Sequence, residues 1–199
     1  AFLDVTGCEK LFGKAFDIAK KIKGAIYEKT NLTSSAGIGS NKFFAKLASN
    51  LGKPNGLTVL EKTPEIMSKI KMLPVSSIWG IGKSTEESLN KMGVKSIGDL
   101  ANIPLEILKM KFKEMGEFIY KMANGIDNRS VLTPSDPKSI GREMTLSANT
   151  SDMPTLRIVA LRLIQKIAAN LSREKCKGRT ITIKVRFSDF TGTSSRITI

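Results

Sequence analysis

The sequence predicts an α+β protein of several domains, and three observations support this class. Helical and strand patterns alternate along residues 1–71, as they do in an α/β domain. Residues 72–125 show only helical patterns, joined by short connections. Strand patterns return in residues 139–199, around one amphipathic helix. We therefore divide the chain into a partial α/β domain, an all-α domain, a linker at 126–138 and a partial split-βαβ domain.

The elements of the first domain follow from short sequence patterns. AFLDVT has the pattern of a strand, and residues 9–29 have the apolar spacing of a helix with a basic outer face. LTSSAGIG is a strand of small residues, and Ser40 after it is placed to cap a helix that contains Phe43 and Phe44. GLTVL is another short strand. Thr63-Pro64 then opens a further helix, because proline is tolerated at the first helical position.

The most informative segment lies in the second domain and reads VSSIWGIGKSTEESLNKMGV, residues 75–94. Gly80 and Gly82 can adopt backbone angles closed to other residues, so successive N–H groups can point toward one phosphate. Ser84 and Glu87 have the capping-box spacing, which predicts a helix whose positive N-terminal end favours an anion. An ordinary turn is the alternative, but the basic Lys83 and a set of apolar residues favour a helix-hairpin-helix motif. The apolar residues are Ile78, Ile81, Leu89, Val94, Ile97 and Leu100.

The second domain is predicted to end in a cap and an exposed linker. Met115-Gly116 indicates a break between two helices, and Gly125 is expected to end the last helix. GIDNRSVLTPSDPKS follows, rich in Pro, Asp, Ser and Asn and poor in apolar residues, which is typical of an exposed segment.

The third domain is predicted from four patterns in the order β-α-β-β. SIGREMTLS, RTITIKVRF and SSRITI have strand patterns, and residues 155–171 form an amphipathic helix. This order opens a split βαβ sheet but stops before its second helix and last strand. Within RTITIKVRF, Lys184 and Arg186 share one face of the strand, and the other face is apolar. A solvated sheet face is the alternative to a nucleic-acid contact here.

Composition limits the classes of partner. The 199 residues carry a formal net charge of +14, and 41% of them are hydrophobic, which favours packed cores and a polyanionic partner over a disordered basic tail. Residues 140–199 hold eleven Lys or Arg against four Asp or Glu, which is half of the net charge. A basic surface that binds nothing is the alternative, because basicity alone does not identify a ligand.

Cysteine and histidine usage excludes two further classes. Cys8 and Cys176 are the only cysteines and the chain has no histidine, which excludes a disulfide framework and a zinc site with His ligands. No apolar run has the length of a membrane span, and AFLDVTGCEK lacks the basic start of a signal peptide. We therefore expect a cytoplasmic protein with no membrane partner. Because AFLDVT opens without a starting methionine or a preceding turn, we expect the chain to begin inside a domain. Because the split βαβ pattern stops before its second helix and last strand, we expect it to end inside one as well.

Several separated segments resemble one family. They are SAGIGSNKFFAKLASNLGKPNGLTVL, LPVSSIWGIGKSTEESLNKMGVKSIGDLANIP, NGIDNRSV, KSIGREMTL and GRTITIKVRFSDF. In this order they resemble the bacterial DinB-type DNA polymerases of the Y family, and the resemblance covers essentially the whole chain. It implies the C-terminal part of a palm at 1–71, a helix-hairpin-helix thumb at 72–125 and a truncated little finger at 139–199.

The resemblance also implies an activity. The family copies DNA past damaged bases, using two divalent metal ions held by clustered carboxylates, and the resemblance implies Mg²⁺ as this metal in the intact enzyme. In the family these are an aspartate near the start of the protein and an Asp-Glu pair directly before the segment that here begins AFLDVT. They would lie upstream of Ala1, so we assign no catalytic or metal-binding residue in this chain and expect it to bind DNA without catalysis. Asp4 belongs to the same strand motif and is expected to be structural.

The resemblance assigns roles to individual residues. Lys53, in LGKPNG, matches the lysine that contacts the triphosphate of the incoming nucleotide, a role suited to a long, flexible point charge. The matches to residues that contact DNA are Gly80, Ile81, Gly82 and Lys83 in the thumb, and Arg142, Lys184 and Arg186 in the little finger. The implied partners are primer–template DNA and a deoxynucleoside triphosphate, with a sliding clamp as a further partner that the sequence leaves open. Ser194 and Ser195 stand where the family usually has a Thr-Arg pair, so no contact is assigned there.

Two other functions fit parts of the sequence. A stand-alone helix-hairpin-helix module in repair or recombination would use the same hairpin and basic strand without polymerisation. RNA binding is disfavoured, because aromatic residues make up 6% of the chain and base stacking needs them.

Overall fold

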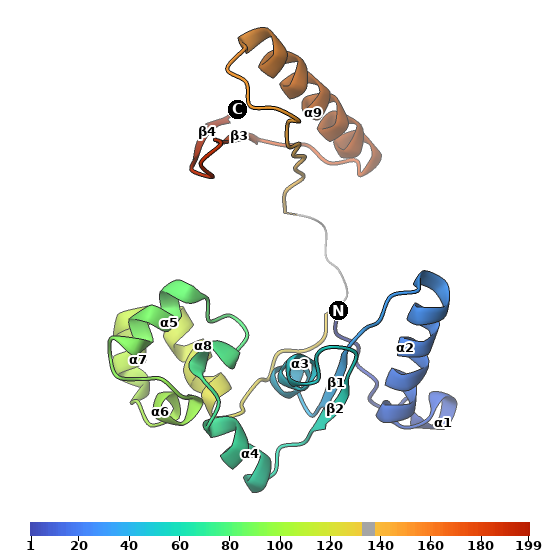
Figure 1. Cartoon of the computed structure of the whole chain (residues 1–199), viewed down its shortest axis with the longest axis vertical. Coiled ribbons are helices and arrows are strands. Elements are labelled where there is room, and N and C mark those ends of the chain that lie inside the picture. Colours follow the sequence, from blue (N-terminus) through green and yellow to red (C-terminus); the bar gives the residue numbers. More distant parts are fainter. Residues whose placement is uncertain (133–137) are drawn as a thin grey trace. The chain divides into compact units, whose positions relative to one another are not determined.

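The computed structural model describes residues 1–132 and 138–199 and divides into two compact units, Ala1–Leu132 and Thr133–Ile199 (Figure 1). Both units combine helices with a two-stranded sheet, which confirms the predicted α+β class. Of the expected linker 126–138, residues 133–137 lie outside the described residues.

A parallel strand pair lies at the centre of the first part of unit 1. Strands β1 (Ala36–Gly39) and β2 (Leu57–Leu60) pair in register from Ala36 opposite Leu57 to Gly39 opposite Leu60. Helix α3 (Lys42–Leu51) connects them, and α2 (Ala15–Thr30) also contacts both strands (Figure 1). The small residues of β1 let α3 pack closely, because a Cβ on Gly37 would lie 2.1 Å from the backbone oxygen of Ala45.

Three expectations for this part of the chain are wrong in detail. AFLDVT is irregular rather than a strand; it pairs with no described strand, so its backbone has no ladder partner. The expected helix at 9–29 is two helices, α1 (Glu9–Phe12) and α2, because Gly13 takes a φ of +90° between them. Asn41, not Ser40, caps α3, and its Oδ1 accepts a hydrogen bond from the N–H of Phe44 at 3.0 Å.

Helix α4 (Pro64–Lys71) forms as predicted. The side chain of Thr63 accepts a hydrogen bond from the N–H of Ile66, and Pro64 occupies the first turn. α4 contacts the helical part that follows, so the expected boundary near residue 71 falls inside one compact unit.

The helical part contains a short 3-10 turn and four helices. They are η1 (Val75–Ser77), α5 (Lys83–Asn90), α6 (Ile97–Ala101), α7 (Leu105–Phe112) and α8 (Glu114–Ala123). The expected capping box of Ser84 and Glu87 is wrong, because α5 begins two residues earlier than that box requires, with Gly82 as its N-cap. The capping box that does form joins Ser96 and Asp99 at the start of α6.

The break between α7 and α8 lies at Lys113, which has a φ of +54°, and not at Met115-Gly116 as expected. Gly116 instead lies inside α8, where a Cβ would be 2.1 Å from the backbone oxygen of Leu108. Its role is therefore to let α8 cross close to α7, and the pattern that indicated a break marks a close helix contact.

Gly125 ends α8 as predicted. It has a φ of +66°, its N–H donates to the carbonyl of Met122, and the next N–H, of Ile126, donates to the carbonyl of Lys121. The expectation of an exposed segment after it is wrong at Asp127, which is only 6% exposed.

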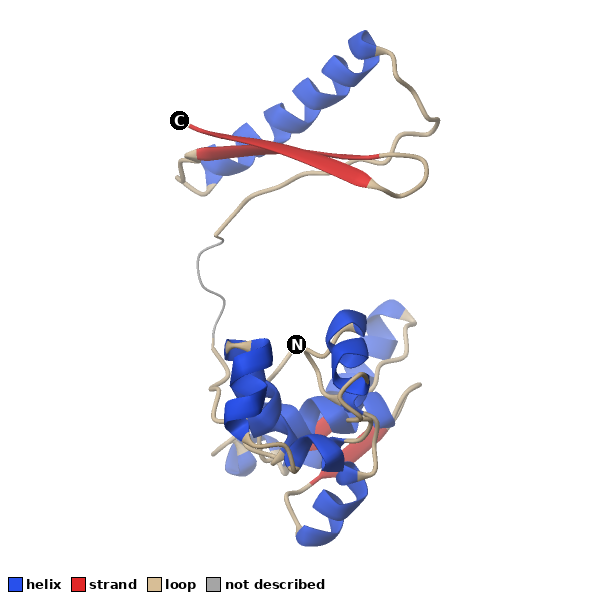
Figure 2. Ribbon diagram, turned by 90° about the vertical axis from the view of Figure 1, so that its left-hand side faces the viewer, coloured by secondary structure: helices blue, strands red, loops and turns tan. Residues whose placement is uncertain are grey.

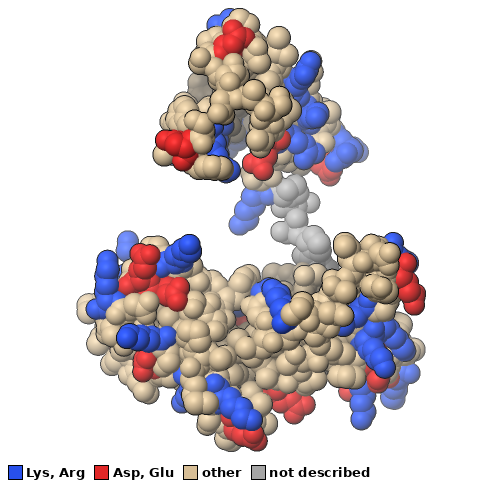
Figure 3. Space-filling view, in the orientation of Figure 1, with Lys and Arg blue, Asp and Glu red and all other residues tan. Residues whose placement is uncertain are grey.

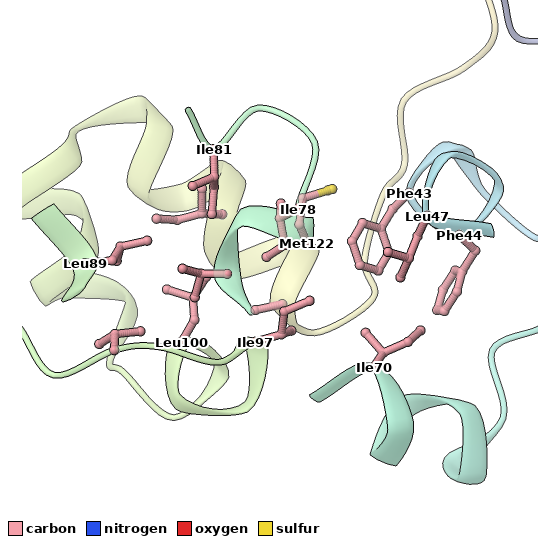
Figure 4. Packing of buried hydrophobic residues seen from close by; sticks show 14 of the residues in the cluster. Phe43, Phe44, Leu47, Ile70, Ile78, Ile81, Leu89, Ile97, Leu100 and Met122 are labelled. Atoms are coloured by element: carbon pink, nitrogen blue, oxygen red, sulfur yellow. The ribbon is translucent and has the colours of Figure 1, made fainter. Parts of the chain in front are cut away.

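One hydrophobic core joins α3 and α4 to the helical part of unit 1. Figure 4 shows Phe43, Phe44 and Leu47 beside Ile70, with the isoleucines and leucines of the helical part next to them. The six apolar residues predicted to support the hairpin are all buried.

Unit 2 contains one long helix and a β-ribbon. Helix α9 (Met153–Arg173) is capped by Asp152, whose carboxylate accepts a hydrogen bond from the N–H of Thr155 at 2.9 Å. Strands β3 (Thr180–Arg186) and β4 (Gly192–Thr198) pair antiparallel beside it (Figure 2). SIGREMTLS is not a strand, because it has no ladder partner among the described residues, so the observed order is α-β-β.

None of the helices in the described residues combines the length and the apolar character that crossing a bilayer requires.

Candidate nucleic-acid interface

The predicted hairpin turn depends on one of its two glycines. Gly80 has a φ of +106°, which side chains rarely allow, and a Cβ there would lie 3.0 Å from Cε1 of Phe118. Gly82 has a φ of −91° and a ψ of 174°, so the expectation that its backbone is closed to other residues is wrong. Ile81 between them is buried and its N–H donates to the carbonyl of Ile78, so it anchors the turn to the core.

Gly82 nevertheless leaves open space at the turn, because nothing described lies within 4 Å of where its Cβ would be. As the N-cap of α5 it supplies no side chain to the helix terminus, and among the described residues none caps these N–H groups. The first N–H groups of any helix lack an intrahelical partner and carry the positive end of its dipole. The turn therefore presents open space, free backbone donors and the exposed Lys83 together.

Lys53 lies elsewhere in unit 1, in the loop between α3 and β2, and its side chain is exposed. Lys23 of α2 holds this loop: its ammonium donates to Oδ1 of Asn55 at 2.8 Å and to the backbone oxygen of Asn55 at 3.0 Å, and also to the carbonyl of Ser34. Lys53 is therefore an exposed cation on a fixed loop, separate from the hairpin turn.

The other predicted DNA contacts lie in unit 2. Arg142 is exposed in an irregular segment, and Lys184 and Arg186 lie on one face of β3. Register adds a residue that the sequence left unassigned: Arg196 of β4 pairs with Thr182 and so lies on the same face. This basic face consists of Thr180, Thr182, Lys184, Arg186, Gly192, Ser194, Arg196 and Thr198. Every titratable side chain on it is a cation.

A cluster that sequence reasoning missed lies beside the hairpin, and we call it the Asp127–Arg129 clasp. Arg129 donates from Nε to Oδ1 of Asp127 at 2.7 Å and from Nη2 to Oδ2 at 2.8 Å. The same guanidinium lies 5.2 Å from the ring centroid of Trp79 and 4.9 Å from that of Phe118. The hydrogen bonds from Arg129 lower the pKa of Asp127 below its usual value, even though burial acts in the opposite direction.

The first turn of α3 holds the clasp from the other side. The backbone N–H of Phe43 faces Asp127 and adds slightly to the lowering of its pKa. The side-chain amide of Asn41 donates to the carbonyl of Gly125 at 3.3 Å, and the ammonium of Lys42 donates to the carbonyl of Ser130. One signal could have found the clasp in the sequence: Arg129 is the only arginine in residues 1–132, where every other basic residue is lysine.

Acidic and basic side chains are mixed over the visible face of unit 1 (Figure 3). Glu117 illustrates this, since it forms ion pairs with Lys109 at 3.0 Å and Lys121 at 2.7 Å, which lower its pKa to about 2. Unit 1 therefore presents no uniform basic field on that face, and local geometry rather than net charge distinguishes the hairpin. Within the described ranges, no group of three or more Asp, Glu, Cys or His side chains is placed to hold a metal ion.

Three family profiles match consecutive parts of the chain. The impB/mucB/samB family matches residues 1–50, the thumb domain of DNA polymerase-iota matches residues 76–127, and the C-terminal domain of the impB/mucB/samB family matches residues 137–199.

Relatives and solved structures agree with these profiles. DNA polymerase IV of Desulfatibacillum aliphaticivorans is 39% identical over 201 aligned residues, which cover 100% of this chain and 50% of that protein. A Y-family DNA polymerase chimera of Dbh and Dpo4 matches with a TM-score of 0.81 at 28% identity, over 99% of this chain and 56% of the other. An insertion ternary complex of Dbh DNA polymerase matches with a TM-score of 0.62 at 28% identity, over 98% and 56%. The chain spans about half the length of the curated relatives it matches.

Proposed function

The chain belongs to the impB/mucB/samB family of Y-family DNA polymerases, in its DinB-type branch, and from this premise we propose that it is a DNA-holding part of a translesion polymerase. The observation that carries the proposal is the open helix terminus at Gly82, next to the strained turn at Gly80. In this proposal the protein positions primer–template DNA for nucleotide addition past damaged bases.

The hairpin would hold DNA through a phosphate. The N–H groups at the start of α5 are donors without a side-chain acceptor among the described residues, and the helix dipole favours an anion there. The missing side chain at Gly82 leaves room for a phosphate to approach the backbone. Lys83, directly after it, adds a point charge. Such contacts position the duplex without reading its sequence.

Two further regions complete the proposal. The basic face of β3 and β4 would contact the sugar–phosphate backbone through Lys184, Arg186 and Arg196, and Arg142 would add a contact nearby in the sequence. Lys53 would bind the triphosphate of an incoming deoxynucleotide, supported by its exposure and by the loop that Lys23 fixes. The free Cys8 and Cys176 fit a reducing compartment, and we place the protein in the cytoplasm.

The metal ions of the family's reaction do not fit the described residues. Mg²⁺ needs oxygen ligands from clustered carboxylates, and the described parts of the chain hold no such cluster. We therefore propose that this chain holds DNA without extending it.

DNA binding tests the proposal directly. The affinity of the chain for a fluorescently labelled primer–template duplex is measured by anisotropy over a series of salt concentrations. We expect affinity to fall steeply with salt, because each phosphate contact releases counterions. Gly82→Ser should weaken binding while the fold is kept, because serine is a favoured N-cap residue but fills the open space. Binding that is insensitive to both salt and Gly82→Ser would contradict the proposal.

Primer extension is the companion experiment. With Mg²⁺ and all four deoxynucleotides, we expect the chain to leave the primer unextended. Appearance of longer products would show that the described residues do supply a metal site, and it would contradict the proposal that this chain holds DNA without extending it.

A further inference from the structure

We propose that Arg129 is a positioning residue for the DNA-binding hairpin. It fixes Trp79 and Phe118 against the first turn of α3 and so sets where the turn of Gly80–Lys83 lies. The proposal rests on the proposed function, because the hairpin must bind DNA for its position to matter. Arg129 is not part of the hairpin: in the sequence, the rest of the helical part lies between the hairpin turn and Arg129.

The fixed end of this connection is Asp127. Its side chain is fully inaccessible to solvent, whereas the side chain of Arg129 is 41% exposed. Both carboxylate oxygens of Asp127 accept from Arg129. The segment around the pair is tied to the start of α3, because the side-chain amide of Asn41 donates to the carbonyl of Gly125 and the ammonium of Lys42 donates to the carbonyl of Ser130. A buried carboxylate in a two-point pair has little freedom. The guanidinium is therefore held near the first turn of α3.

The other end of the connection is the hairpin itself. Trp79 directly precedes Gly80, and Phe118 of α8 is the side chain closest to the position of a Cβ on Gly80, at 3.0 Å. The two rings that lie near the Arg129 guanidinium are thus the two that border the turn. A second contact points the same way: Phe2 lies 6.1 Å from Trp79, and the ammonium of Lys42, on α3, lies 5.5 Å from the ring of Phe2.

Arginine is suited to this role in a way that lysine is not. A planar guanidinium can pair with a carboxylate at two points and lie against aromatic rings at the same time, while an ammonium is a compact point charge. In residues 1–132 this chain uses lysine at every other basic position. Two of the five guanidinium N–H donors are used by Asp127, and the group also lies near two rings, so it is tied to the fold of the hairpin region.

Arg129→Lys is the decisive variant, because it keeps the charge and removes the planar fork. We expect its affinity for the labelled duplex to fall about tenfold, equivalent to about 1.4 kcal/mol of binding free energy, because the hairpin turn is then no longer held in its binding position. Lys111→Met, which removes an exposed cation from α7, is the matched control and should change affinity less than Arg129→Lys does. Lys83→Met should also reduce the slope of log affinity against log salt concentration by about one, because it removes one phosphate contact. Arg129→Lys should leave this slope unchanged.

Trp79 gives a second readout that does not depend on DNA. It is the only tryptophan in the chain and is 49% exposed, so its emission and its quenching by acrylamide report on the contact with Arg129. We expect Arg129→Lys to make Trp79 easier to quench, with the far-ultraviolet circular dichroism unchanged. Unchanged quenching, or wild-type affinity in Arg129→Lys, would overturn the proposal.

The outcomes separate this inference from the proposed function. If the wild-type chain fails to bind duplex DNA, the proposed function is wrong, and the quenching result alone decides whether Arg129 fixes Trp79. If Arg129→Lys does not fold, Phe118→Leu replaces it, because this change removes one ring and leaves the Asp127 pair in place. Wild-type DNA affinity in a folded Phe118→Leu would overturn the proposal as well.

Discussion

At the scale of single residues, Gly80 determines whether the hairpin turn can form. Its φ of +106° is strained for any residue with a side chain, and Phe118 lies where a Cβ would point. We expect Gly80→Ala to lower the free energy of unfolding by about 1–2 kcal/mol, measured by urea denaturation. Gly82→Ala, at an ordinary φ with open space around it, is the control and should cost about 0.5 kcal/mol. Equal losses at the two positions would contradict the assignment of the turn to Gly80.

Asp127 makes stability depend on pH in acid. Its pKa lies below the usual 3.8, chiefly because Arg129 donates hydrogen bonds to it, so its contribution to stability is complete above that value. The contribution is lost as the pH falls through the lower, folded-state pKa. We expect wild type to be more stable than Asp127→Asn at neutral pH, and the difference to shrink steadily below about pH 4.

The measurement is urea unfolding of both proteins at matched pH values from neutral to strongly acidic. Other carboxylates, including Glu117 with its pKa of about 2, are common to both proteins and cancel in the difference. A difference that stays constant with pH would show that Asp127 contributes through shape alone.

The sequence located the hairpin but missed the clasp, for a physical reason. Residues 80–83 are contiguous, so glycine spacing and the following helix pattern reveal them together. Trp79, Phe118 and the Asp127–Arg129 pair come from three separate parts of the chain and meet only after α8 has packed against the hairpin. Contacts between distant segments leave no repeating pattern in the sequence. The single arginine among lysines was the only available signal.

At the scale of elements, replacing either of two helical glycines by alanine should change the free energy of unfolding, with opposite signs at the two positions. Gly116 of α8 lies against α7, where a Cβ would be 2.1 Å from the oxygen of Leu108, so Gly116→Ala should cost about 3 kcal/mol of unfolding free energy through overpacking. Gly24 of α2 has nothing within 4 Å of its Cβ position, and Gly24→Ala should gain about 0.5–1 kcal/mol from helix propensity.

Thermal and urea unfolding of the two variants beside wild type provide the measurement. Because the substitution is chemically the same, the opposite signs isolate the effect of the neighbouring helix. A stabilised Gly116→Ala would mean that α7 and α8 do not cross as closely as the structure has them.

Element identity was more predictable than element boundaries. Helix caps show why: Ser84 and Glu87 have the same spacing as Ser96 and Asp99, yet only the second pair closes a capping box. The difference is that Gly82 already begins α5, a conclusion that requires the fold of the turn. Strands were overpredicted at AFLDVT and SIGREMTLS. Alternating apolar and polar residues indicate which side chains share a face, but a strand also needs a neighbouring strand to hydrogen-bond with its backbone.

At the scale of the whole molecule, the two units differ in how much of their apolar surface is buried. The buried core residues run from Phe43 to Ala123 and therefore all belong to unit 1. In unit 2, no residue of the described range 138–199 is buried, and the apolar face of the ribbon, with Ile181, Ile183 and Ile197, is more than half exposed. A two-stranded ribbon with one helix is marginal without further apolar burial. The surface of unit 2 that would contact DNA thus belongs to the unit with less buried apolar surface.

Amide hydrogen exchange should resolve this difference. We expect the amides of α3 and α8 to exchange only through opening of the unit 1 core, because these helices carry fully buried side chains. The amides of β3 and β4 should exchange at least about 100-fold faster, a difference in opening free energy of about 2.8 kcal/mol. Peptide-resolved mass spectrometry of one sample measures both sets, so each serves as the control for the other. Adding primer–template DNA should slow exchange in β3 and β4 more than in α3, because ligand contacts add to the stability of the region that binds. Equal protection in the free chain would mean that the ribbon opens only together with the core.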